Sequence, residues 1–249
     1  MFQPPPMSRP RTAIPALRRG HASRAAVLRA LVEHREWLVP VSFFPRERVA
    51  TCGKVSFGPR SHMPPGELWI FTETATVHAA LAHGAVLGSY VPSIQGTELF
   101  GALTDEVRLL RVNPSGYADD LLAFEPQSFP ELRAWADRVR HEQRLLGTKV
   151  DPAALRACPE LHVPLLPDGR MIAKPGHDGF AQPGVVCTSL DCYEAFVGAL
   201  DPGLAAQLRH VVVDGETFLR DMSRQREVDA LYFNPFGPAP TRTWSRAAL

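Results

Sequence analysis

The chain has 249 residues, of which 45% are hydrophobic and 21% are charged, and its formal net charge is +1. This length and composition are typical of a globular protein with one large domain or two modest ones. The near-neutral charge and the scattered basic residues give no basic surface for nucleic acid, and no apolar stretch is long enough to cross a membrane.

The first half of the chain begins with a Pro- and Arg-rich segment, residues 1–22, which carries no hydrophobic periodicity and is predicted to be a flexible leader. The elements expected after it follow from hydrophobic spacing and from capping and turn residues. In chain order they are a helix from Ser23, a strand over 37–44, a strand over 68–71, a helix over 75–83 capped by Thr72 or Thr74, a short strand over 87–91, a short helix or turn over 95–103, and a strand over 107–112 that ends at Asn113-Pro114.

The second half begins with a long amphipathic helix, which the spacing of its apolar residues predicts over 129–146. The elements expected after it again alternate between strand and helix. They are a short helical turn at Pro152, a hairpin of strands 161–166 and 170–174 around Asp168-Gly169, a strand over 184–187, a helix capped by Thr188 or Ser189, a helix over 214–224, a strand over 230–233 that ends at Asn234-Pro235, and an extended tail over 237–244.

The two halves share a pattern. Asn113 follows Thr72 at nearly the same spacing as Asn234 follows Thr188, and each Asn is followed by Pro. Each block is preceded by a Val-Pro pair that follows a Glu, and the helices after the two threonines carry apolar residues at matching offsets. Such self-similarity at a fixed spacing predicts an internal duplication, which determines the architecture before any chemistry is considered.

We therefore predict an α/β (α+β) fold made of two tandem repeats, each a small mixed sheet flanked by helices. The predicted division places the leader at 1–22, the first repeat at 23–125, a linking helix at 126–159, and the second repeat with its extended tail at 160–249.

Residues that carry catalytic or metal chemistry are few. Cys158 and His162 lie too close to a proline for one helical face and lack further ligands, so no metal is expected. Gly96 belongs to no phosphate-binding motif and is expected to serve a turn. Cys187 ends an apolar strand before a helix, which would lower its pKa if it faced solvent, but Phe71 at the matching position favours packing. No catalytic residue and no cofactor are predicted.

The Asn-Pro turns are the strongest candidates for a binding surface. They terminate core strands, which is a structural role in itself. Loops at the carboxyl ends of strands are also where ligands bind in α/β sheets, and aromatic residues flank both turns. The predicted interaction surface consists of Asn113, Pro114, Tyr117, Asn234, Pro235, Phe236 and Trp244.

These motifs resemble the SseB N-terminal domain of the enhanced-serine-sensitivity protein family. The resemblance rests on Val39-Pro40, on the strand ending in Phe71-Thr72, on the Ala-rich helix after it, and on Val112-Asn113-Pro114. It covers residues 36–116, and more loosely 160–237. It implies a cytoplasmic α/β module without established catalytic residues, in a bacterial family found near secretion or toxin–immunity systems.

The predicted function is that of a non-catalytic cytoplasmic bacterial protein, a regulatory or binding module that recognises another protein. Two alternatives stay open: an immunity or adaptor factor for a toxin or secretion-system effector, and an enzyme with a thiol or acid/base site between the repeats. The cytoplasmic location is expected because the N-terminus lacks the apolar core of a secretory signal and the four cysteines form no CxxC pair.

Overall fold

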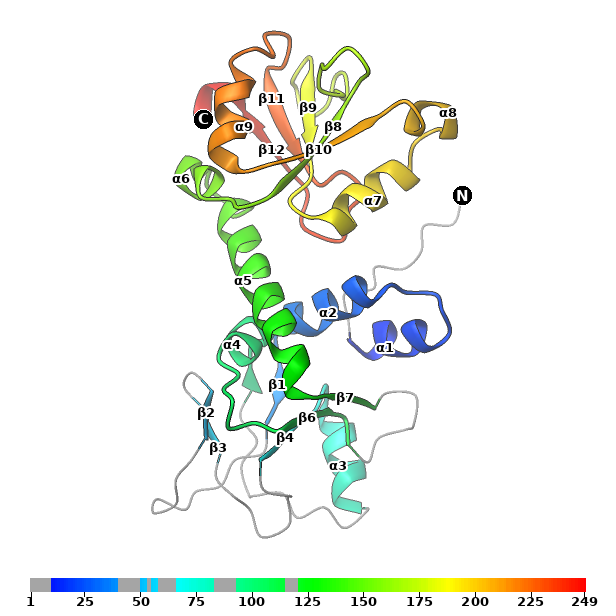
Figure 1. The fold of residues 1–249 in the computed structure, drawn as a ribbon, viewed down its shortest axis with the longest axis vertical. Helices are drawn as coiled ribbons and strands as arrows, with labels where there is room; N and C mark the ends of the chain where they lie inside the picture. Colours follow the sequence, from blue (N-terminus) through cyan, green and yellow to red (C-terminus); the bar gives the residue numbers. More distant parts are fainter. Residues whose placement is uncertain (1–9, 40–49, 53–54, 58–65, 83–92, 115–120) are drawn as a thin grey trace. The chain divides into compact units, whose positions relative to one another are not determined.

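A computed structural model describes residues 10–39, 50–52, 55–57, 66–82, 93–114 and 121–249 (Figure 1). The chain divides into two compact units, Met1–Val139 and Arg140–Leu249. Each unit combines helices with small mixed sheets, as expected of an α+β fold. The predicted strand residues 40–44 and 87–91 and the candidate Tyr117 lie outside the described residues.

The N-terminal unit begins with two helices, α1 (Pro10–Arg18) and α2 (Arg24–Glu33). The prediction of a flexible leader is therefore wrong for residues 10–18. Ala13 and Ile14 of α1 are fully buried in the same core cluster as α2, and this burial offsets the ordering cost that the sequence pattern did not reveal. α2 starts as predicted, because the Ser23 hydroxyl accepts the Ala26 N–H at 3.1 Å.

The main sheet of this unit has the order β4-β6-β7. β4 (Glu67–Ile70) and β6 (Leu109–Val112) pair in parallel, and β7 (Leu122–Phe124) is antiparallel to β6. Two further pairs are antiparallel: β1 (Trp37–Leu38) with β5 (Ser93–Ile94), and β2 (Ala50–Cys52) with β3 (Val55–Phe57). The remaining elements are α3 (Thr74–Ala82), α4 (Gly96–Gly101), the 3-10 turn η2 (Pro126–Ser128) and α5 (Phe129–Leu145).

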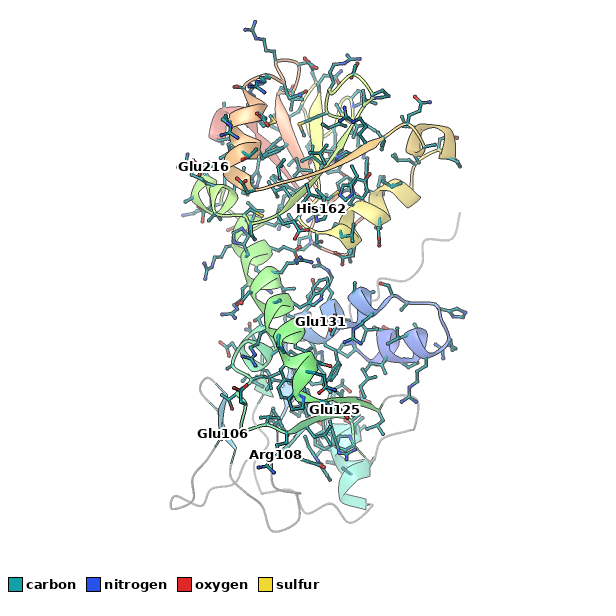
Figure 2. The ribbon with its side chains drawn as sticks, in the orientation of Figure 1. Glu106, Arg108, Glu125, Glu131, His162 and Glu216 are labelled. Carbon is teal, nitrogen blue, oxygen red and sulfur yellow. The ribbon has the colours of Figure 1, made fainter. Side chains whose placement is uncertain are left out.

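The core of the N-terminal unit is aromatic and aliphatic, and it includes the buried cation Arg29. Trp37 packs edge-on against Phe100, at 5.8 Å between ring centroids. Arg29 is buried, forms an ion pair with Glu33 at 3.0 Å, and lies over the Trp135 ring. A buried charge needs such partners, so these contacts attach α5 to α2. Arg24 adds an exposed ion pair with Glu131 of α5, which Figure 2 labels.

In the C-terminal unit the main sheet has the order β12-β11-β9. β9 (Pro183–Val186) and β11 (Ala230–Phe233) pair in parallel, and β12 (Arg242–Ser245) is antiparallel to β11. β8 (Leu161–Leu165) pairs antiparallel with β10 (Arg209–Val213). The helices are α6 (Pro152–Arg156), α7 (Leu190–Gly198), α8 (Pro202–Ala205), α9 (Gly215–Met222) and the 3-10 turn η3 (Arg246–Ala248).

Three segments of this unit differ from the prediction. The predicted return strand 170–174 forms only isolated bridges, Leu165 to Met171 and Ala173 to Gly184, because these residues change partner from β8 to β9. The predicted extended tail contains strand β12, and strand β10 was not predicted. β10 pairs with β8, which is distant in sequence, and local patterns do not encode such a pairing. β12 pairs with β11, the strand before it, and the prolines between the two strands favoured the prediction of an extended tail.

The two units share strand order and strand direction, each with a parallel pair followed by an antiparallel third strand. Leu38 and Phe71 exchange two backbone hydrogen bonds of 2.9 Å, and His162 and Cys187 exchange bonds of 2.8 and 2.9 Å. These likenesses support the predicted internal duplication, which itself stays a prediction.

A glycine begins the corresponding helices α4 and α9 of the two units. A Cβ on Gly96 would lie 2.4 Å from the Val32 carbonyl oxygen, and one on Gly215 would lie 1.7 Å from the Leu155 carbonyl oxygen. Only glycine allows this close approach of the backbone. Gly96 therefore allows close packing at the start of α4, whereas the sequence predicted that it serves a turn.

Candidate functional site

Each unit contains a buried hydrogen-bonded pair at the carboxyl end of its parallel strands. In the C-terminal unit the Asn234 side-chain oxygen accepts the Thr188 N–H at 2.8 Å, and the Asn234 amide donates to the Thr188 hydroxyl at 2.9 Å. In the N-terminal unit Asn113 and Thr72 form the same two bonds, at 2.9 and 3.1 Å. Asn113 and Asn234 both have a φ of 50°, a left-handed conformation that asparagine tolerates.

The asparagines therefore have a structural role, and the prediction that they belong to an interaction surface is wrong. Both side chains are fully buried, and Pro114 and Pro235 beside them are buried as well. The Thr188 hydroxyl also donates to the buried carboxylate of Glu142, at 2.8 Å. In a site closed to solvent these bonds satisfy one another, so they fix the strand ends.

The prediction that Trp244 belongs to the interaction surface is also wrong. Its side chain is only 3% exposed and packs edge-on against Phe233, at 5.0 Å between ring centroids. Its position on β12 directs it into the core beneath β11. The tail was expected to be extended, and its pairing with β11, which buries this ring, was not predicted.

Among the predicted surface residues that the structure describes, Phe236 alone is exposed to solvent. Its side chain is 57% exposed, and its φ of 65° is rare for a residue with a bulky side chain. A hydrogen bond closes the turn that carries it, because Gly237 donates its N–H to the Asn234 carbonyl at 3.1 Å. The turn also packs closely against α7, since a Cβ on Gly237 would lie 3.0 Å from the Cys192 sulfur. The ring is therefore presented by a fixed turn.

Three further side chains gather around Phe236, and with it they form what we call the Phe236 platform: Lys174, His177, Tyr232 and Phe236. The Lys174 ammonium lies 5.3 Å from the Tyr232 ring centroid and 5.8 Å from that of Phe236, within the range of a cation–π contact. The His177 ring lies 4.0 Å from the Tyr232 ring.

The loop beneath the platform is held to β12, because the Thr243 hydroxyl donates to Asp178 at 2.5 Å. Within the platform the exposed Phe236 ring lies beside the exposed residue Lys174, whereas Tyr232 is buried and His177 is partly buried. This combination suits a partner that brings an apolar group and a carboxylate.

The sequence did not identify Lys174, His177 or Tyr232 as site residues. Lys174 was predicted to end the return strand 170–174, and His177 belongs to the Gly/Pro-rich loop after it, which was interpreted only as a connection. The signal available for Tyr232 was its alternation with Phe233 on a strand next to the Asn-Pro turn, since alternate residues of a strand face opposite sides.

Cys187 does not meet the conditions for a nucleophile. Its side chain is fully buried, and this burial raises the pKa of the thiol far above its usual value, with a further contribution from Cys192 and Asp191. A thiol kept protonated and away from solvent is unreactive. The structure thus agrees with the packing role that the matching Phe71 suggested.

A second polar cluster joins β8, β10 and α7. His162, which Figure 2 labels, lies with its Nδ1 atom 2.8 Å from Nε2 of His210, and the His210 ring stacks on Tyr193 at 3.9 Å. The Glu160 carboxylate lies 2.9 Å from Nε2 of His162. Two ring nitrogens at this distance share one proton, so at least one imidazole is neutral. Burial raises the pKa of Tyr193, with a smaller contribution from Cys187.

This cluster connects elements of the fold. Within the described part of the chain, no three His, Cys, Asp or Glu side chains are arranged to hold a metal ion. In the same part of the chain, no helix is both long and apolar enough to cross a membrane.

Comparison with protein-family models, with curated proteins and with solved structures found no match for the chain.

Proposed function

We propose that this chain is a non-catalytic cytoplasmic bacterial protein that binds another protein, and that the Phe236 platform is its contact surface. The observation that carries the proposal is the conformation of Phe236. A bulky residue in the left-handed region costs about 1–2 kcal/mol, and an exposed ring contributes little to the core in return. A turn with a strained backbone that presents an aromatic ring to solvent is typical of a recognition site.

The chemistry of the platform defines the partner segment. An apolar or aromatic side chain stacks on the exposed Phe236 ring, and a nearby carboxylate pairs with the Lys174 ammonium. Lys174 is already held near two rings, so less conformational entropy is lost when it pairs. We therefore expect a segment that contains at least one Asp or Glu next to a large apolar residue.

The proposal includes a two-copy SseB-like architecture, supported by the matching Thr–Asn pairs and the matching sheets. The residue after the Asn-Pro pair distinguishes the copies, since Ser115 in the first corresponds to Phe236 in the second. The shared residues hold the strand ends, whereas the differing residue is the exposed one in the second copy. Recognition by this platform is thus a property of the C-terminal unit.

A random-peptide display library panned against the full chain tests this function. We expect enrichment of peptides that combine an acidic residue with an aromatic or large aliphatic one. A synthetic peptide of the enriched sequence should bind Phe236→Ala at least about tenfold more weakly than the wild-type chain, and Lys174→Gln several-fold more weakly. Leu190→Ala is the control, because Leu190 is an exposed apolar residue outside the platform.

Two results would contradict the proposed function. If no sequence is enriched, or if the enriched peptide binds Phe236→Ala as tightly as the wild-type chain, the platform is not a recognition site. Circular dichroism of each variant shows that the comparison is made between folded proteins.

A further inference from the structure

β10 has an open edge. Arg209–Val213 pairs with β8 on one side, and in the part of the chain that the structure describes no backbone hydrogen bond is made along the other side. Figure 1 shows this strand between α8 and α9. An open strand edge presents unpaired N–H and C=O groups and is a template for pairing with another strand.

The register identifies the backbone groups on the open edge. His162 uses its N–H and its C=O to bond Cys187, at 2.8 and 2.9 Å, so both groups point away from β10. Val212 lies opposite His162. In an antiparallel pair, residues opposite each other either exchange both bonds or neither, so the N–H and C=O of Val212 point to the open side.

The same reasoning applies to His210. It lies opposite Pro164, which has no N–H and whose carbonyl accepts the Ile172 N–H at 3.3 Å. His210 and Val212 therefore both direct their backbone donors and acceptors outward, two residues apart. The side chain of Val212 is 51% exposed, so the edge also offers apolar surface.

We propose that this edge pairs with the same edge of a second copy of the chain, giving a dimer. In the antiparallel arrangement with its twofold axis at Val211, His210 of one copy lies opposite Val212 of the other. Each outward N–H then meets an outward C=O, which forms about four backbone hydrogen bonds. The arrangement is self-complementary, as a closed dimer requires.

Charge favours a second copy as the occupant. The strand begins with Arg209, and its far end is followed by Asp214 and Glu216. Antiparallel pairing of two copies brings the basic end of each strand next to the acidic end of the other, so both ends are complementary. A parallel arrangement would instead place like charges together.

The expected dimer is weak. One strand pair of this length buries less than the roughly 1,200 Å² found in stable complexes, so the association should depend on concentration in the micromolar range or above. The inference is independent of the proposed function, because none of the residues on this edge belongs to the Phe236 platform.

Sedimentation equilibrium of the full chain, over increasing concentrations, tests the proposal. We expect a monomer–dimer equilibrium that Val212→Pro weakens at least about tenfold, because proline removes an outward N–H while leaving the bonds to β8 intact. Val212→Lys should weaken it as well, by adding a charge to the paired edge, and it decides the matter if the proline variant does not fold. Val150→Lys is the matched control, since Val150 is an exposed valine outside β10.

A chain that stays monomeric at every concentration would overturn the proposal, and so would a dimer that Val212→Lys leaves unchanged. Higher oligomers that persist in Val212→Lys would also overturn it. If the chain is monomeric and Val212→Lys loses binding of a display-selected peptide while Phe236→Ala retains it, the edge accepts an extended peptide and the second copy is the wrong occupant.

Discussion

Asn234 and Thr188 lie 46 positions apart in the sequence and are joined by a hydrogen bond of 2.8 Å from the Thr188 N–H to the Asn234 side chain. Asn113 and Thr72, which are 41 positions apart, form the equivalent bond at 2.9 Å. In each unit the bond connects the ends of two parallel strands. The sequence spacing that suggested a duplication is thus the spacing of two hydrogen-bonded pairs.

Replacing Asn234 by alanine should destabilise the C-terminal unit by about 2–4 kcal/mol. The substitution leaves the buried Thr188 N–H without its partner, at a cost of about 1–3 kcal/mol, and puts alanine in a left-handed conformation, at a cost of about 1 kcal/mol. Chemical denaturation measures the free energy of unfolding. Asn234→Gly is the control and should be about 1 kcal/mol more stable than Asn234→Ala; equal stability of the two variants would mean that the positive φ carries no cost.

The two aromatic residues near the last strands should respond in opposite ways. Trp244→Ala removes a buried ring and should destabilise the chain by about 3–5 kcal/mol. Phe236→Ala removes an exposed ring and should change the unfolding free energy by less than about 0.5 kcal/mol. Thermal unfolding compares them directly. A large loss of stability in Phe236→Ala would show that its ring supports the fold rather than recognition.

Glu67 should make the N-terminal unit sensitive to acid. Partial burial opposes its ionisation, but hydrogen bonds from Arg111 and Trp69 outweigh this and lower the pKa of Glu67. Its stabilising contribution is therefore present above the unfolded-state pKa and is lost as the pH falls through the folded-state pKa. Because Arg111 is partly exposed, we expect Glu67→Gln to cost about 1 kcal/mol at neutral pH.

The pH dependence of the unfolding free energy distinguishes a contribution of the Glu67–Arg111 ion pair from a contribution of side-chain packing. The stability difference between Glu67→Gln and the wild-type chain should shrink as the pH falls through the lowered folded-state pKa of Glu67, because the wild-type carboxylate is then protonated too. A difference that is constant from neutral to acidic pH would point to shape or packing instead of charge.

Three cysteines of the C-terminal unit should resist alkylation in the folded chain. Cys158, Cys187 and Cys192 are buried, and burial raises the pKa of Cys187. Mass spectrometry after brief iodoacetamide treatment should find these three labelled only once denaturant is added. Rapid native labelling of Cys187 would revive the alternative of a thiol enzyme.

Elements with strong local patterns were predictable. β4, β6, β9 and β11 are apolar runs between turn residues, and α5 has clear amphipathic spacing, so local physics and tertiary structure agree. β10 was missed because its partner β8 is distant in sequence. α1 and β12 pack against their neighbours α2 and β11, but each lies in or next to a proline-containing stretch that was interpreted as irregular.

The candidate site was predictable only in part. The Asn-Pro turn drew attention to Phe236, but the same reasoning included Asn234 and Trp244, whose side chains are buried. A turn motif does not reveal which of its side chains face solvent. The approach of Lys174 to Phe236 required the three-dimensional path of a loop about 60 residues earlier in the chain, for which the sequence holds no local signal.

Photo-crosslinking in the native host can show whether the Phe236 platform contacts another protein. The photoreactive residue p-benzoylphenylalanine is placed at position 236 in one variant and at position 190 in another. We expect a defined protein adduct from position 236, which is lost when Lys174→Glu is added, and no such adduct from position 190. Absence of an adduct at 236, or the same adducts from both positions, would contradict the account.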